Sequence, residues 1–501
     1  MRAPPALSAL AVAALLAACA SPGDIAARAQ LRPAAELGLQ PVPGAAGPLV
    51  APSWWTAFHE PALDALVQRA LADNPNLKTV RARAERAAAA VAGAEAAAGP
   101  RVDGSFDATR QRYTENGLYP PPIAGSVRNS ANLQASGSWE LDFFGRNRAA
   151  LDAAIGAQRA AAAETAAAQL ALGSNVARAY FQLARLGAQR ALAQRSLAQR
   201  EEVLDLVRQR VGAGLDTNVE LRQGEGSIPE VRAQLEALDE QMLLTRHALA
   251  ALSAQPPDAL QALAPKLQTV AAVAPPAVLP LDLLGQRADV NAARWRVEAA
   301  TSDVAVARTL FYPNVSLTAF VGLNAFGLDR LLEAGSVNLG AGPALRLPIF
   351  DAGRLRANLH GKAADLDAAV ESYNAAVLDA VHDAADRIAS LRSVERQRRE
   401  QAAAQAAAES AYDLALQRYR AGLGTYLVVL TAESNVLAQR RASADLKARA
   451  LETQVDLARA LGGGYGANTP SPPPSPAGGR GSIAAPSAPY PGERVGVRGS
   501  T

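Results

Sequence analysis

The sequence predicts a mainly α-helical chain with a small β part, built from two copies of one unit. Two nearly identical turns, "RVGAGLDT" (210–217) and "RYRAGLGT" (418–425), each follow one long helical stretch and precede another. Gly214 and Gly422 are 208 residues apart (422−214), and so are Gly145 and Gly353 (353−145), which open the helices before the turns. A constant offset between such distant landmarks indicates an internal duplication. In each copy, two segments of alternating residues precede the long helix and predict a pair of β-strands.

The composition narrows the class of protein. The 501 residues are enough for more than one average domain. The hydrophobic fraction is 49%, but much of it is alanine, and only 5% of the residues are aromatic. This favours long, closely packed helices over a thick globular core. The net charge is only +3, and no dense basic stripe with interleaved aromatic residues is present, so we expect no nucleic acid partner.

The N-terminus predicts a lipoprotein signal peptide over residues 1–18 and a lipidated leader over 19–60. Arg2 precedes a short apolar run that is typical of a signal peptide and ends in "LAAC" (16–19). Cys19 is the only cysteine of the chain. This resembles a bacterial lipobox, in which cleavage precedes the cysteine and its thiol carries lipid; the alternative is an unmodified cysteine. An acylated cysteine anchors a chain to a membrane without spanning it.

The first copy is expected over residues 61–253. Its strands are predicted at about 101–113 and 129–143, and a long helical hairpin follows over 145–253. Apolar residues recur at sevens along the first helix of the hairpin, with Arg190 the one exception, and predict a coiled-coil-like seam: Val176, Leu183, Leu197, Leu204 and Val211. That helix would be roughly 100 Å long. Pro229 predicts a kink in the returning helix.

The second copy repeats this order after a proline-interrupted linker over 254–286. It is expected over residues 287–466. Its strands are predicted at about 314–323 and 336–350, and its hairpin over 353–461. The last segment, 467–501, is rich in proline, glycine and serine and predicts a disordered tail.

The four predicted strands imply an oligomer if they lie in lipid. The best later apolar stretch, 267–284, is cut by three prolines, so a membrane crossing would have to use strands. An open four-stranded sheet would leave unpaired backbone groups in hydrocarbon. Three chains that each donate four strands would close a barrel of about twelve. The long helices would extend from one end of this trimeric β-barrel and form a second, helical barrel.

Two further segments resemble a known family. "WWTAFHEPALDALVQRALADNPNL" (54–77) is similar to its opening W-x-x-F-x-x-P-x-L-x-x-L pattern, and the segment 283–322 is similar to its entry into the third strand. The chain thereby resembles the outer-membrane factors of tripartite efflux pumps, the TolC-like channels, and in particular their lipoprotein (OprM-like or NodT-like) branch. The resemblance runs from Cys19 to about Leu461. It departs from the family where Ala288 stands in place of the usual proline of an Arg-Pro-Asp motif.

This resemblance implies an architecture and a set of partners. It implies a homotrimer with helices that reach into the periplasm. Ala20, rather than an aspartate, follows Cys19, and by the sorting rule that the resemblance brings, this favours the outer membrane. An equatorial region would be built from 254–286 and the C-terminal helix. A periplasmic adaptor (membrane fusion) protein would meet the helix tips and couple the channel to a proton-driven inner-membrane pump. No cofactor is implied.

The resemblance also assigns the candidate functional residues. The two turns match the tip loops that dock the adaptor, with these residues: Gly214, Leu215, Asp216, Thr217, Glu220, Gly422, Leu423, Gly424 and Thr425. The pore constriction would be formed by Tyr426, Leu427 and Thr431. In a trimer, Leu427 would form a ring of leucines that narrows the pore. Some relatives carry an aspartate and an arginine where this chain has Thr431 and Ser434, so the charged residues that would hold this ring closed are not kept here.

The sequence therefore predicts a passive outer-membrane exit duct of an RND-type efflux pump for drugs or other small toxic compounds. Two alternatives stay open: the duct of a type I protein secretion system, and a lipidated coiled-coil tether without a pore. Enzyme activity is not expected. The four histidines have no metal-ligand spacing, and neither an H-E-x-x-H nor a G-x-S-x-G motif is present.

Overall fold

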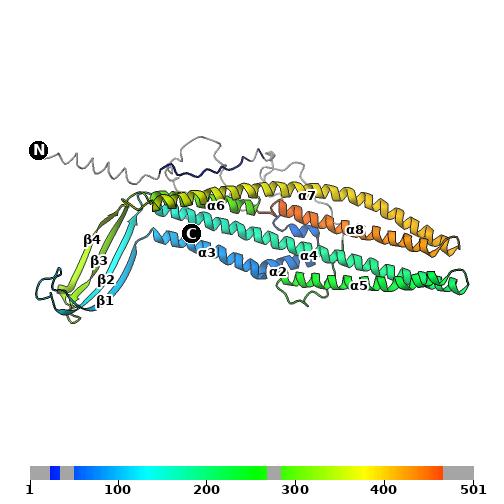
Figure 1. Cartoon of the computed structure of the whole chain (residues 1–501), viewed down its shortest axis with the longest axis horizontal. Helices are drawn as coiled ribbons and strands as arrows, with labels where there is room; N and C mark the ends of the chain where they lie inside the picture. Colours follow the sequence, from blue (N-terminus) through cyan, green and yellow to red (C-terminus); the bar gives the residue numbers. More distant parts are fainter. Residues whose placement is uncertain (1–22, 34–35, 37–49, 268–283, 466–501) are drawn as a thin grey trace, which may run out of the picture.

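The computed structural model describes residues 23–33, 36, 50–267 and 284–465. Cys19, the signal peptide and the tail 467–501 lie outside these residues. The described chain is long and thin, with a sheet at one end and paired helices that reach to the other end (Figure 1). It is thus mainly helical with a small antiparallel sheet. None of the helices in the described ranges combines the length and the apolar character that a bilayer crossing requires.

The sheet consists of four antiparallel strands in the order β1-β2-β3-β4. Their bounds are β1 (Arg101–Arg112), β2 (Val127–Leu141), β3 (Asn314–Phe326) and β4 (Val337–Arg346). β2 and β3 join the two copies, with Leu133 opposite Leu323. β3 continues beyond the expected end at 323, and β4 ends at Arg346, before the expected end at 350. Every residue of β1 is exposed, and among the described residues the outer edges of β1 and β4 face no other strand.

The helices repeat in length as well as in sequence. α4 (Arg146–Gly212) and α7 (Arg354–Arg420) have 67 residues each, and α5 (Asn218–Leu252) and α8 (Tyr426–Ala460) have 35 each. The two long helices therefore extend roughly 100 Å. α5 is a single helix that includes Pro229. The shorter helices are α2 (Pro61–Asp73), α3 (Pro75–Ala97) and α6 (Ala288–Thr309).

The core is a thin seam between helices rather than a globular centre. Along α4, the heptad residues Val176, Leu183 and Leu204 are buried, and Leu197 is half-buried. Arg190 interrupts the seam and forms an ion pair with Asp239 of α5. The broadest part of the core lies where the short 3-10 helix Trp54–Phe58 packs on α2 and α4.

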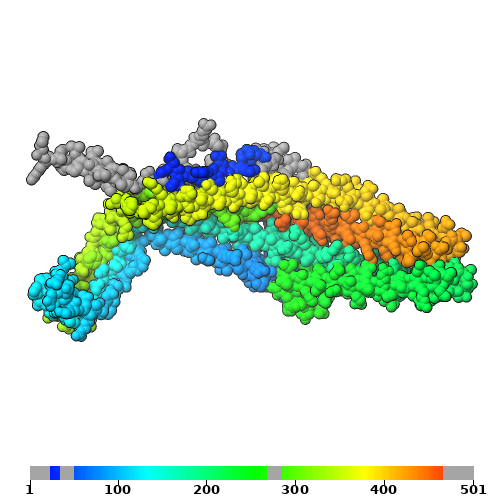
Figure 2. Space-filling model, viewed as in Figure 1, coloured from blue at the N-terminus to red at the C-terminus, as the bar shows by residue number. Residues whose placement is uncertain are grey.

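A described piece of the leader, residues 23–33, lies along the outside of α7 (Figure 2). The N–H groups of Arg28 and Ala29 donate to Asp367 Oδ1 at 2.6 and 2.7 Å. Asn374 accepts from the N–H of Arg32 and donates to the carbonyl of Gln30, each at 3.0 Å. Two side chains of α7 therefore hold the leader by its backbone, and Ile25 of the leader packs against an apolar cluster of α6 and α7.

Candidate functional site

The far ends of the two hairpins have the same backbone turn. Gly214 and Gly422 have φ angles of +74° and +76°, the left-handed region that favours glycine. The N–H of Leu215 donates to the carbonyl of Arg210, and the N–H of Leu423 donates to that of Arg418, both at 2.8 Å. These bonds close the last helical turn as a Schellman motif. The repeated sequence is thus a repeated helix stop.

The turns present leucines to solvent. Leu215 and Leu423 stand at the apex of each turn, and both side chains are about two-thirds exposed. Val219 and Val428, in the first turns of α5 and α8, are also exposed. Each tip thus exposes a leucine and a valine close together in the sequence.

The two return helices begin differently, although each begins after a threonine. The hydroxyl of Thr217 accepts from the N–H of Val219 at 3.2 Å, and its N–H donates to Glu220 Oε2 at 3.0 Å. This is a capping box. The hydrogen bond from the Thr217 hydroxyl lowers the pKa of the Glu220 carboxyl. Thr425 makes no side-chain cap bond at the start of α8. The side chains of Thr217 and Glu220, in contrast, stabilise the first turn of α5.

This asymmetry predicts different effects of the same substitution. Thr217→Ala should loosen the first turn of α5 by about 1 kcal/mol, because an N-cap side chain is lost. Thr425→Ala is the matched control and should change α8 very little. Amide hydrogen exchange at residues 219–222 and 427–430 measures both effects. Equal protection losses at the two tips would contradict the assignment of the cap.

A cluster of three polar side chains joins the two tips within one chain. Arg210 of α4 pairs with Asp216 through two bonds, Nε to Oδ2 at 2.9 Å and Nη2 to Oδ1 at 3.2 Å. The hydroxyl of Tyr419, at the end of α7, donates to Asp216 Oδ2 at 2.5 Å. The Arg210 guanidinium also lies over the Tyr419 ring, 4.7 Å from its centroid. We call Arg210, Asp216 and Tyr419 the tip latch.

The tip latch is shielded from solvent. The side chains of Arg210 and Asp216 are 14% and 11% exposed, and Tyr419 is fully buried. The hydrogen bond from Arg210 lowers the pKa of the Asp216 carboxyl, and burial followed by the bond to Asp216 raises the pKa of Tyr419. Asp216 was expected at a docking surface, but its side chain points into the chain and holds α7 against the first tip.

The three expected constriction residues do not share one environment. Tyr426 is only 2% exposed and packs beside Tyr419, so it belongs to the seam between the hairpins. Leu427 is 57% exposed. Thr431 is exposed, and its hydroxyl donates to the carbonyl of Leu427 at 2.8 Å. Only Leu427 and Thr431 therefore have side chains on the surface of the chain.

Sequence reasoning missed a second charged contact nearer the middle of the hairpins. Arg200 of α4 and Glu433 of α8 form a buried ion pair, with side chains 9% and 8% exposed. Ser196 donates to Glu433 at 3.0 Å, and Arg200 donates to the carbonyl of Ser227 in α5 at 3.1 Å. The pair thus ties three helices together. Neither residue lies in a motif, and only the fold brings them together.

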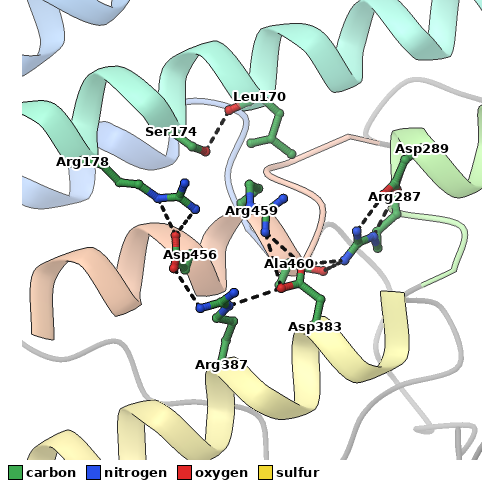
Figure 3. Close-up of polar contacts among 10 residues, drawn as sticks. All are labelled: Leu170, Ser174, Arg178, Arg287, Asp289, Asp383, Arg387, Asp456, Arg459 and Ala460. Carbon is green, nitrogen blue, oxygen red and sulfur yellow. Dashed lines mark hydrogen bonds and ion pairs between the residues drawn. The ribbon is translucent and has the colours of Figure 1, made fainter. Parts of the chain in front are cut away.

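A polar cluster lies at mid-length, where α4, α6, α7 and α8 meet (Figure 3). Arg287 is buried and donates to Asp289 at 2.7 Å and to the carbonyl of Ala460, the last residue of α8, at 3.0 Å. Arg387 joins Asp383 and Asp456 at 3.2 and 3.1 Å. Arg178 of α4 also pairs with Asp456. Arg287 thus links the start of α6 to α7 and α8, and Asp289 pairs with it from the first turn of α6.

In the described residues no group of three or more histidine, cysteine or carboxylate side chains is placed to hold a metal ion. The features that stand out are the exposed leucines at the tips and the charged contacts that join the hairpins.

Comparison with known proteins gives a consistent result. The family model described as outer membrane efflux protein matches residues 66–255 and 279–463. Among curated proteins, the chain is 33% identical to the multidrug resistance outer membrane protein MdtP of Shigella flexneri, over 82% of this chain and 86% of that one. It is also 33% identical to the pyoverdine export outer membrane protein OpmQ of Pseudomonas aeruginosa, over 82% and 87%.

A solved structure has the same fold. The outer membrane protein VceC of Vibrio cholerae superimposes with a TM-score of 0.78 at 34% identity, over 83% of this chain and all of that chain.

Proposed function

The chain belongs to the outer membrane efflux protein family and is an outer-membrane efflux channel, and we propose that it is the exit duct of a tripartite, RND-type pump for small toxic compounds. The observation that carries the proposal is the joining of a small sheet with two free edges to hairpins roughly 100 Å long. The relatives MdtP and OpmQ, which are named for multidrug resistance and pyoverdine export, favour small molecules over secreted polypeptides.

The working form in this proposal is a homotrimer. Unpaired backbone groups at the edges of β1 and β4 are not tolerated in lipid, so β4 of one copy pairs with β1 of the next. Three copies then close a twelve-stranded barrel. The exposure of β1 on both faces fits a strand that has lipid on one side and a water-filled lumen on the other. A tether without a pore would not need such a sheet.

The ends of the molecule have separate roles in this proposal. Cys19 carries lipid and holds the leader at the outer membrane, while the helices extend into the periplasm. The exposed leucines Leu215 and Leu423 contact a periplasmic adaptor protein, which connects the duct to the inner-membrane pump. Leu427, rather than the buried Tyr426, narrows the pore at its periplasmic end. Acyl labelling that persists in Cys19→Ser would refute the lipid anchor.

Reconstitution tests the duct itself. The purified full-length protein should form pores of uniform conductance in planar bilayers, and Leu427→Ala should raise that conductance because it shortens the side chain at the constriction. Leu244→Ala, an exposed leucine on α5 away from the tips, is the control and should leave the conductance unchanged. Purified oligomer without any conductance would sink the proposal.

A further inference from the structure

We propose that a cleft where the sheet meets the helices binds the phosphate group of a membrane phospholipid, an inference that rests on the proposed placement of the sheet in the membrane. The cleft has a volume of about 330 Å³. It is lined by the ends of β2 and β4, the start of β3, the C-terminal end of α6 and the first residues of α4 and α7. It therefore lies at the level where a strand leaves lipid and a helix enters water.

Two unpaired cations flank this cleft. Arg346, the last residue of β4, and Arg354, the first of α7, line it and are exposed. Within the part of the chain that the structure describes, neither side chain has an ion pair or a hydrogen bond. A guanidinium binds a phosphate through two parallel hydrogen bonds. The positive ends of two 67-residue helices, α4 and α7, add to the field at the same place.

The acidic residues of the cleft already have partners. Glu140 lies 3.6 Å from Arg146, which is the third arginine of the lining. Asp142 accepts from the N–H of Arg148 at 3.0 Å and so caps α4. Asp351, outside the lining, caps α7 by accepting from the N–H of Leu355 at 2.8 Å. The two remaining arginines are thus available to an external anion.

The lining also includes three exposed aromatic side chains, Phe143, Phe144 and Tyr312, which favour a lipid over a free phosphate. Phe143 is 69% exposed, and the rings of Phe144 and Tyr312 stack at 5.0 Å with an interplanar angle of 10°. Phe350, on the segment that leads into α7, is 89% exposed. Girdles of aromatic residues flank the apolar band of outer-membrane barrels at both borders of the membrane. In this proposal the arginines contact the phosphate of the lipid, and the exposed rings contact its acyl chains.

Native mass spectrometry of the detergent-solubilised oligomer tests this site, with dioleoyl phosphatidylglycerol as the probe. The double variant Arg346→Gln/Arg354→Gln should bind the lipid at least about tenfold more weakly, because two charge-assisted contacts are lost. The control Arg392→Gln/Arg396→Gln removes the same number of charges from exposed positions of α7, roughly 60 Å along the helix from Arg354. It should bind within about twofold of the unmodified protein.

Each other outcome has a defined meaning. Equal binding by the two double variants would overturn the site. Glycerophosphoglycerol, the same headgroup without acyl chains, should not compete at similar concentrations, and equal competition would overturn the phospholipid assignment. Loss of the oligomer mass in Arg346→Gln/Arg354→Gln would show that a neighbouring copy covers the cleft, which also overturns it. Planar-bilayer conductance separates the two proposals: normal conductance with no lipid effect removes only the lipid site, and absent conductance with normal lipid binding removes only the duct.

Discussion

Asp216→Asn is expected to raise the resting conductance of the reconstituted channel severalfold. The substitution removes the charge that Arg210 and the Tyr419 hydroxyl both contact, at 2.9 and 2.5 Å. Each such charge-assisted bond contributes about 1.5 to 3 kcal/mol. If the proposed channel widens at its periplasmic end by a movement of the α7–α8 hairpin relative to the α4–α5 hairpin, the tip latch, which joins these hairpins, opposes that movement. Losing one bond therefore shifts the closed-to-open ratio by roughly tenfold or more.

A matched control separates the latch from a general effect of charge. Asp205 on α4 also pairs with an arginine, Arg208 at 2.9 Å, but both side chains are more than half exposed. An exposed pair of this kind contributes about 0 to 1 kcal/mol, so Asp205→Asn should conduct like the unmodified channel. Tyr419→Phe keeps the ring in the seam, removes only the hydroxyl, and should reproduce part of the effect. Unchanged conductance in Asp216→Asn would contradict a closing role for the latch.

The latch also predicts a dependence on pH. The pKa of Asp216 is lowered from its ordinary value of 3.8, chiefly by the hydrogen bond from Arg210. A carboxyl with a lowered pKa stabilises the folded arrangement at pH values above 3.8, and this contribution is lost as the pH falls through the lowered value. The latch should therefore stay closed between pH 5 and 8, and acid opening should begin only below about pH 3.8.

The duplicated architecture is predictable from the sequence, because it depends on local patterns. Equal spacing of the Gly-Leu turns predicts hairpins of equal length, and α4 and α7 have 67 residues each. The T-x-x-E spacing of Thr217 and Glu220 contains the capping box, although the resemblance suggested a docking role for both residues. The Gly-Leu turns and the capping box each depend on residues close together in the chain, and the duplication follows from the repeat of such local patterns at a constant offset.

The contacts between the hairpins are not predictable in this way. Tyr419 and Asp216 are 203 residues apart, and Arg200 and Glu433 are 233 apart. Which residues of α4 meet which residues of α7 and α8 depends on the axial alignment of two long rods, and a shift of one helical turn, about 5.4 Å, would change every pair. The burial of Asp216 and Tyr426 was missed for the same reason: the direction of each side chain depends on the neighbouring hairpin.

Glu433→Ala is expected to cause the largest loss of stability among single substitutions in the hairpins. The Arg200 guanidinium lies between three helices, and its side chain is only 9% exposed. The substitution removes its carboxylate partner. Breaking a buried pair on one side costs about 3 to 5 kcal/mol, because an uncompensated charge stays buried. The apparent melting temperature of the oligomer and the hydrogen exchange of residues 196–204 measure the loss. Glu225→Ala, which breaks the exposed pair with Arg222, is the control and should cost no more than about 1 kcal/mol.

The double variant Arg200→Met/Glu433→Leu distinguishes a buried charge from a simple packing defect. If the uncompensated charge causes the loss, removing both charges should recover most of the stability that Glu433→Ala loses, since apolar replacements of a buried pair are often neutral. A packing defect would instead make the double variant worse than either single one. Glu230 lies 3.5 Å from Arg200 but is largely exposed, so it offers a partial substitute. Adding Glu230→Ala to Glu433→Ala should therefore deepen the loss, whereas no further change would show that Arg200 has left the seam and reached water.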